Sequence, residues 1–463
     1  MLDAVVVGSG PNGLAAALTL ARAGKSVRVL EAAASPGGAA RSLELTVPGV
    51  IHDHCASVPA LGFAGPFLPT VPGIDLSHPA VAAAHPLDGL PAALVHRDLQ
   101  TTIEGLGSDG KRYRKSVGEL ADQWKVTRKL ILGKPGRLPP NPAKAAKVGR
   151  ILTRSAASVI DKSGPRLGAL TAGMAAHGGL PLDGIATAGI GSALLAAAHV
   201  AGWPFVTGGM GRLVEAMVTE LESLSGEVIC GHLVRSRKDL PESRVVLLDT
   251  APGAAATILG LSGRVGSALR SVRHGPGVWK VDWLLDGPIP WSDPTVAGAG
   301  TVHVGGSARA ISKALKQVDG GDHPSKPFVL VTQPSVADPS RAPEGQHVAW
   351  AYTHVPNGSE VHMTGRIERQ MERFAPGFKD RVLARSTTSP TEFEADNPNI
   401  VGGDISNGAP TLGQILARPR PSLTPWRLTK GAYLCSAATP PGPGIHGMCG
   451  VHAATTALAN ELA

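Results

Sequence analysis

The chain has 463 residues and a formal net charge of +8, and only 4% of its residues are aromatic. This length allows two or three domains with substantial cores, and the 58 glycines and 39 prolines are spread among apolar stretches, which excludes a low-complexity chain. The four cysteines show neither C-x-x-C nor zinc spacing, so we expect free thiols in a reducing compartment, no metal site and no disulfide reductase chemistry.

The first 31 residues predict a βαβ dinucleotide-binding unit. A short β-branched strand runs into three glycines at G-x-G-x-x-G spacing, and a second strand, 27–30, follows a helix of small residues. In such a unit the glycines make a tight turn and let the backbone approach a pyrophosphate, while the helix N-terminus presents free N–H groups to it. An acid at the end of the second strand hydrogen-bonds the ribose. The expected cofactor-binding residues are Gly8, Gly10, Pro11, Asn12, Gly13 and Glu31.

The residues that follow favour FAD as the dinucleotide. A carboxylate at Glu31 repels a ribose 2′-phosphate, which argues against NADP. Gly37 and Gly38 let the chain pass close to a ligand, and Arg41 can contact phosphate bidentately. This extension resembles the FAD-binding signature of the amine oxidase and phytoene desaturase superfamily, and implies cofactor contacts from Gly38 and Arg41. An NAD site with an ordinary glycine turn is the alternative.

Residues 111–154 are strongly basic, with thirteen Lys and Arg residues against two acids, Glu119 and Asp122. A solvated basic face is one interpretation, and a peripheral contact with an anionic membrane surface is the other. Nucleic acid is not expected, because no recognised nucleic-acid module accompanies the charge. We expect a cytoplasmic protein, with or without such a peripheral contact.

Residues 184–203 carry no formal charge over about the length that spans a bilayer. The stretch is dominated by glycine and alanine and includes Thr187, Ser192 and His199, so its hydrophobicity is low for a membrane span. We therefore predict a buried, cavity-lining helix and no transmembrane segment.

A second group of segments fits the same cofactor. A glycine turn at 208–211 opens an amphipathic helix, and strands around 226–234 and 244–249 follow. This order resembles the second FAD-contacting segment of the superfamily, which implies contacts from Gly208, Gly209, Met210 and the backbone of Val234. The later glycine cluster at 260–263 lacks a βαβ context, so no second dinucleotide unit is expected. The flavin would then be reduced by the substrate directly, or by a nicotinamide that visits the same cleft.

Lys280 is the candidate catalytic lysine. It lies between Trp279 and Trp283 in an apolar strand, and a buried lysine needs a partner or a neutral state. The segment resembles that of amine oxidases in which a lysine holds a water near flavin N5, which implies the same position for Lys280. The alternative is that the two-residue alternation of the strand points Lys280 to solvent.

The C-terminal region predicts a strand at 431–435, a Gly/Pro loop and a small-residue helix. The N-terminus of such a helix can stabilise negative charge at the N1/O2 edge of a reduced flavin. By resemblance, Gly447 and Met448 contact the cofactor. His446 is a candidate proton-handling residue, although a hydrogen bond to the loop backbone is the alternative for its side chain.

Over the whole chain the resemblance is closest to the phytoene desaturase-like flavoproteins, in the branch named for a pyridine nucleotide-disulfide oxidoreductase domain. It implies an α/β fold, in which a Rossmann-type FAD-binding domain is assembled from discontinuous segments and an α+β substrate domain has a helical part. The expected segments are 1–60, 205–270 and 395–463 for the FAD-binding domain, and 61–204 and 271–394 for the substrate domain.

The implied activity is dehydrogenation or desaturation of an apolar, isoprenoid or lipid-like substrate by hydride transfer to flavin N5. This chemistry requires a rigid cofactor and a dry cleft more than it requires reactive side chains. The acceptor that reoxidises the flavin, oxygen or a quinone, is left open. A flavin amine oxidase, and a redox-neutral isomerase or non-catalytic flavoprotein, are the alternative functions.

Overall fold

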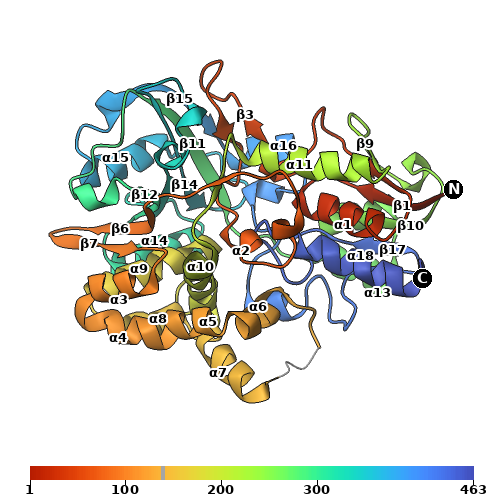
Figure 1. Ribbon diagram of the computed structural model, residues 1–463, viewed down its shortest axis with the longest axis horizontal. Coiled ribbons are helices and arrows are strands. Elements are labelled where there is room, and N and C mark those ends of the chain that lie inside the picture. Colours follow the sequence, from red (N-terminus) through yellow and green to blue (C-terminus); the bar gives the residue numbers. More distant parts are fainter. Residues whose placement is uncertain (137–140) are drawn as a thin grey trace.

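Two large sheets organise the protein (Figure 1). The computed structural model describes residues 1–136 and 141–463. The first sheet has the strand order β16-β17-β10-β1-β2-β9, and the second has the order β15-β11-β14-β13-β12-β6-β7. The strands of the first sheet are β1 (Leu2–Val7), β2 (Val27–Leu30), β9 (Glu227–Ile229), β10 (Ser243–Leu248), β16 (Arg427–Thr429) and β17 (Ala432–Leu434). Those of the second are β6 (Val81–Leu87), β7 (Leu90–Val95), β11 (Gly277–Leu285), β12 (Ala299–Val304), β13 (Val329–Thr332), β14 (His347–Val355) and β15 (Val382–Thr388).

The first sheet is parallel except for its edge strand β16, and helices cover both of its faces. On β1, Ala4 and Val6 pack into one core, whereas Val5 and Val7 pack into another. Burial on both sides explains why this strand is continuously apolar. The first core is closed by α1 (Pro11–Ala21), α11 (Met210–Ser223) and α18 (Met448–Asn460), and the second by α12 (Pro252–Ile258) and α13 (Gly263–Arg270).

The second sheet is antiparallel except where β6 pairs with β12. All nine residues of β11 are buried. Val281 and Trp283 pack in the same core as α15 (Thr364–Phe374), while Val278 packs in the core that includes Trp350, Tyr352 and α14 (Ala308–Asp319). Lys280 lies on β11 and is only 1% exposed, so the alternative that strand alternation points it to solvent is wrong.

A helical part packs beside the second sheet, drawn in orange to yellow in Figure 1. Its α10, which includes most of the uncharged stretch 184–203, is largely buried and lines a recess, as expected. No helix among the described residues is long and apolar enough to cross a membrane. The helices of this part are α3 (Leu99–Gly105), α4 (Gly110–Tyr113), α5 (Glu119–Asp122), α6 (Trp124–Leu132), α7 (Pro142–Leu152), α8 (Ala156–Ile160), α9 (Pro165–Ala175) and α10 (Thr187–Ala201).

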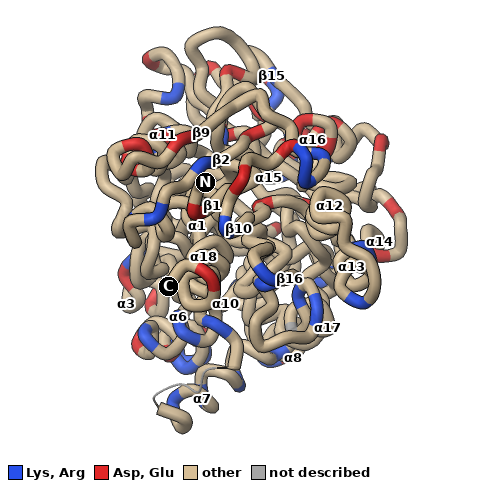
Figure 2. The backbone as a smooth tube through the Cα atoms, turned by 90° about the vertical axis from the view of Figure 1, so that its right-hand side faces the viewer, with Lys and Arg blue, Asp and Glu red and all other residues tan. Residues whose placement is uncertain are grey.

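The basic stretch 111–154 forms α4 to α7, and Figure 2 shows Lys and Arg gathered on α6 and α7. Its two acids are paired within the stretch: Glu119 accepts from Lys147 at 2.8 Å and Asp122 from Arg114 at 2.7 Å. Residues 137–140 of the stretch lie outside the described residues. Contact with a membrane surface stays a prediction.

Short elements complete the chain and link the two sheets. They are the strand pairs β3 (Ser42–Leu43) with β4 (His52–Asp53) and β5 (Leu76–Ser77) with β8 (Phe205–Val206), and the helices α2 (Ala60–Phe63), α16 (Pro390–Asp396) and α17 (Leu412–Leu416).

Candidate functional site

The glycine turn between β1 and α1 has the geometry that its spacing predicts. Gly8 has a φ of +96°, and a Cβ atom on Gly13 would overlap the carbonyl oxygen of Gly8. Gly10 faces Gly38, since a Cβ on Gly38 would lie 3.4 Å from the Cα of Gly10. The close backbone approaches that a dinucleotide site requires are therefore present in both glycine segments.

Glu31 lies beside this turn, at the end of β2. Its carboxylate accepts hydrogen bonds from Ser9 N at 2.8 Å, from Ser9 Oγ at 2.6 Å and from Ala33 N at 2.8 Å. A carboxylate has about four acceptor positions, so one remains for a further donor such as a ribose hydroxyl. The buried Oδ1 of Asn12, on the first turn of α1, has no hydrogen-bond partner and is a second open position in this donor and acceptor set.

Asp249 is a residue of this site that the sequence reasoning did not single out. It follows β10, and its Oδ2 accepts a hydrogen bond from Gly13 N at 2.8 Å. Burial raises the pKa of Asp249 to about 7, the nearby Glu31 raises it too, and the Gly13 N–H lowers it. The available signal was its place at the carboxyl end of a strand parallel to β1, because such ends meet at one edge of a sheet.

Arg41 lies next to the second glycine segment and is paired with a carboxylate. It forms an ion pair with Asp396 at the end of α16, and its Nε donates to the carbonyl oxygen of Gly38 at 3.0 Å. His54 Nε2 lies 3.0 Å from the same Asp396 carboxylate. The predicted phosphate contact of Arg41 would therefore be made by a guanidinium that already has an acidic partner.

The turn at 208–211 is held by side chains from other segments. Gly208 N donates to Asp338 at 2.8 Å, and Met210 N donates to Asp53 at 2.8 Å. Arg341 binds both of these carboxylates and is fully buried. The turn thereby fixes the start of α11, which packs on α1, and the cofactor contacts of Gly208, Gly209 and Met210 stay predictions.

Val234 is buried in the core on the α12 side of the first sheet. The sequence places it in a strand, whereas β9 ends at Ile229 and the backbone has left the sheet before Val234. Only its buried side chain remains close to the sheet, and a contact between its backbone and the cofactor is untested.

Lys280 is the centre of a buried charged cluster. Its Nζ forms an ion pair with Asp282, two residues further along the same face of β11, and lies 5.1 Å from the ring centroid of Trp350. His52 Nδ1 lies 3.4 Å from the Asp282 carboxylate, and its Nε2 lies 2.8 Å from Thr46 Oγ1. The ion pair gives Lys280 the partner that a buried lysine needs.

The loop before α18 brings a further part of the chain to the turn. A Cβ on Gly450 would overlap the carbonyl oxygen of Asn12, so the first turns of α18 and α1 touch. His446 Nδ1 accepts a hydrogen bond from Met448 N at 3.0 Å, and burial lowers the pKa of His446 to about 4. The His446 side chain thus forms the hydrogen bond to the loop backbone that was the alternative to a role in proton handling, and the residue is neutral at pH 7.

Contacts connect the glycine turn with the lysine cluster across the two sheets. Gly10 touches Gly38, which accepts from Arg41, and Arg41 shares Asp396 with His54. Desolvation lowers the pKa of His54, the charges of Asp396 and Asp282 raise it, and those of Arg41 and Lys280 lower it. The predicted site residues of the N-terminal segment and of β11 are thus brought together, with His54 between them.

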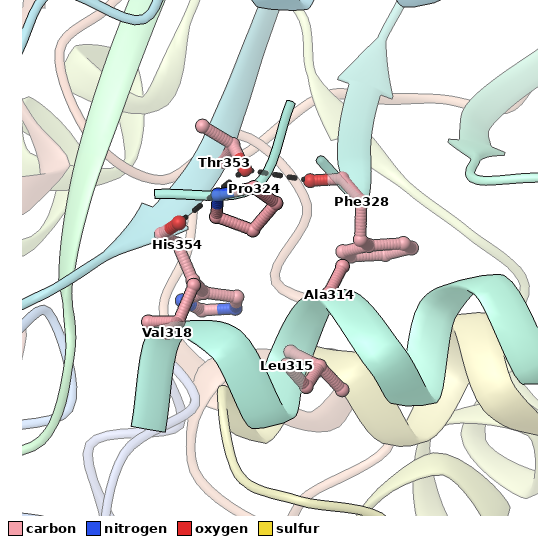
Figure 3. A pocket seen from close by; sticks show the side chains of 7 residues that line it. All are labelled: Ala314, Leu315, Val318, Pro324, Phe328, Thr353 and His354. Carbon is pink, nitrogen blue, oxygen red and sulfur yellow. Dashed lines mark hydrogen bonds between the residues drawn. The ribbon is translucent and has the colours of Figure 1, made fainter. Parts of the chain in front are cut away.

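Figure 3 shows a recess elsewhere, between α14 and the end of β14. Its lining is mostly apolar, and the Thr353 hydroxyl donates a hydrogen bond to the carbonyl oxygen of Phe328 at 2.8 Å. None of the predicted site residues lines it. The lining residues are Ala314, Leu315, Val318, Pro324, Phe328, Thr353 and His354.

Comparison with known families and structures agrees with this architecture. Residues 6–63 match the NAD(P)-binding Rossmann-like domain. A putrescine oxidase with bound putrescine has the same fold over 100% of this chain and 99% of its own, with a TM-score of 0.62 and 16% identity. The expected fold class, a Rossmann-type sheet joined to an α+β part with helices, is confirmed.

Two curated relatives carry the resemblance in sequence. Pyridine nucleotide-disulfide oxidoreductase domain-containing protein 2 of Mus musculus is 34% identical over 157 residues, which is 31% of this chain and 27% of that protein. Phytoene dehydrogenase of Streptomyces griseus is 28% identical over 425 residues, 82% of this chain and 77% of that protein. The chain thus spans about a quarter of the length of the first relative, and the resemblance expected from the sequence is confirmed.

Proposed function

We propose that this relative of the phytoene dehydrogenases and flavin amine oxidases is an FAD-dependent oxidoreductase that dehydrogenates or desaturates an apolar substrate. The observation that carries the proposal is the connected set of contacts from the α1 N-terminus to Lys280. A dinucleotide that binds its pyrophosphate at the glycine turn and extends along Gly38 and Arg41 would reach the face of β11 on which Lys280 and Asp282 lie.

The chain's own residues would bind and orient the cofactor. The glycine turn and the α1 N-terminus bind the pyrophosphate, and Glu31 uses its remaining acceptor position for the ribose. The first turn of α18 touches that of α1, so the positive ends of two helices face the same region. FAD, when bound, supplies the acceptor for a hydride from carbon.

The lysine cluster would form the reactive edge of the cleft. Asp282 holds Lys280 in position, and Trp350 and Tyr352 stack with a centroid separation of 6.2 Å and an interplanar angle of 16°. These two rings and the buried β11 exclude water from that face, which suits an apolar substrate and hydride transfer. A lysine at this edge positions a water or the substrate and need not act as a base.

A flavin amine oxidase is the second candidate function. Its support is the ring pair of Trp350 and Tyr352 next to Lys280, because aromatic faces bind cationic amines. The shared fold with a putrescine oxidase allows this function but does not favour it over desaturation.

The purified protein tests both functions. The visible spectrum, with mass spectrometry of the extracted ligand, establishes whether FAD is bound. Anaerobic bleaching of the flavin by polyenes or other apolar lipids supports the dehydrogenase, whereas bleaching and peroxide formation with an amine panel support the amine oxidase. A protein that binds no flavin, or whose flavin neither class bleaches, would contradict the proposal.

Lys280→Met tests the role of the lysine, with Lys313→Met as its matched control on the exposed surface of α14. We expect the Lys280 variant to keep its FAD and to change the rate of flavin reduction or reoxidation about tenfold or more, because a misplaced water or substrate slows the reaction by up to about a hundredfold. The control should keep the wild-type rates. Equal rates in all three proteins would remove Lys280 from the mechanism.

A further inference from the structure

Asp249 places a carboxyl group where a phosphate group is expected. β10 lies directly beside β1, so the residue after β10 reaches the glycine turn. Its Oδ2 accepts from Gly13 N, and a Cβ on Gly10 would lie 2.7 Å from the same oxygen. Among the described residues, no lysine, arginine or histidine side chain forms an ion pair with this carboxyl group.

A bound dinucleotide would bring negative charge to the same place. The pyrophosphate of FAD is anionic and uses the N–H groups at the start of the helix that follows the glycine turn. A carboxylate next to it would repel it, because the two like charges lie only a few ångströms apart. Asp249 can remain in place next to a pyrophosphate if its carboxyl group is neutral.

The two carboxyl groups beside the turn differ in their partners. Glu31, at the end of β2, accepts three hydrogen bonds, from Ser9 N, Ser9 Oγ and Ala33 N, and these donors favour the ionised carboxylate. Asp249 has one such donor, and burial raises the pKa of its carboxyl group to about 7. Asp249 can therefore change charge near neutral pH.

Two cysteines and one histidine near the first turns of α1 and α18 keep their charge state between pH 6 and 9. Cys435 follows β17, and burial raises the pKa of its thiol well above the ordinary value. Cys449 lies on α18, and burial raises the pKa of its thiol to about 12. Burial lowers the pKa of His446, in the loop before α18, to about 4. The segments 10–21 and 250–258, which form α1 and α12 with their first flanking residues, contain no titratable side chain.

We propose that Asp249 couples FAD binding to the uptake of one proton: the carboxyl group is protonated from solvent as the pyrophosphate binds, and its O–H becomes a hydrogen-bond donor at the start of α1. The inference rests on the proposed function, since it concerns the same cofactor. It assigns Asp249 as a positioning residue that makes cofactor retention dependent on pH.

The dissociation constant of FAD, measured by flavin fluorescence on deflavinated full-length protein between pH 6 and 9, tests the inference. For the wild type we expect little change below pH 7 and a rise of up to tenfold per pH unit above it, because one proton is taken up on binding. Asp249→Asn keeps the shape and supplies an N–H donor, so its dissociation constant should vary less than about threefold over this range. Asp319→Asn, on the exposed end of α14, should behave like the wild type.

Calorimetry in two buffers of different ionisation enthalpy provides a test that needs no variant. At pH 8 the wild type should take up close to one proton per FAD. No proton uptake, a pH-independent wild-type affinity, or an Asp249→Asn variant as pH-dependent as the wild type would overturn the inference and leave the proposed function intact. A wild type that binds no FAD at any pH would overturn both.

Discussion

Replacing Arg341 should destabilise the protein more than replacing any arginine on its surface. The Arg341 guanidinium is fully buried and binds three groups: Asp338 at 2.6 Å, Asp53 at 3.1 Å and the carbonyl oxygen of Val206 at 3.0 Å. The two carboxylates in turn accept from the backbone of the 208–211 turn. Arg341→Met would leave two buried carboxylates without a cation.

The expected loss follows from the cost of an unpaired buried charge. Removing one partner of a buried ion pair costs about 3–5 kcal/mol, because the remaining charge stays desolvated. A cooperative unit of 463 residues has an unfolding entropy of about 1 kcal/mol/K, so the melting temperature should fall by about 3–5 °C. Since the 208–211 turn depends on the same carboxylates, FAD affinity should fall as well.

Arg212→Met is the matched control. Arg212 pairs with Glu215 at 2.8 Å, and both side chains are more than 60% exposed. Exposed pairs contribute less than about 1 kcal/mol, so this variant should melt within about 1 °C of the wild type. Differential scanning calorimetry of the three proteins at pH 7.5 measures both shifts. If the melting temperature of Arg341→Met equals that of Arg212→Met, the buried ion pairs of Arg341 do not stabilise the fold.

Two further perturbations test other parts of the structure. Four histidines, three of them buried and His177 half-buried, have pKa values lowered by desolvation, so they take up protons more readily when the chain unfolds. The free energy of unfolding should therefore fall as the pH drops from 6.5 towards 4. An equal melting temperature at pH 7.5 and pH 5 would contradict this. These histidines are His85, His177 and His354, each at about 4, and His303, well below its ordinary value. Gly13→Ala should weaken FAD binding about tenfold or more, because the added Cβ would overlap the Gly8 carbonyl oxygen. Gly253→Ala is the control: its Cβ meets open space, so this variant should bind FAD as the wild type does. Equal affinities of the two variants would refute the close approach at the turn.

The parts of the fold that the sequence predicted are those with local signals. The turn 8–13, the strand that ends before Glu31 and the strand–loop–helix from 431 onward are each specified by glycine spacing and by alternation within about thirty residues. The structure has these elements where the pattern indicates them. Val234 shows the limit of such signals, because an apolar run does not tell where a short strand leaves its sheet.

The side chains that complete the site came from distant segments, and local patterns carry no information about such pairs. Lys280 and Asp282 lie on one face of β11, as strand alternation requires, but the side chains that cover this face come from distant segments. Trp350 lies on β14, and His52 is more than two hundred residues away in the chain. Asp53 and Arg341 are as far apart, and Asp249 meets Gly13 only because β10 pairs with β1.

The central position of β1 determines when the protein can fold. β2 is synthesised directly after it, but β10, β17 and the α18 helix that packs on α1 come from residues 243–460. At about 5–20 residues per second, synthesis from β1 to α18 takes roughly 20–90 s. During this time one edge of β1 and the apolar face of α1 lack their partners, and such surfaces pair readily with other chains. We therefore expect the nascent chain to depend on a chaperone until the last helix has left the ribosome.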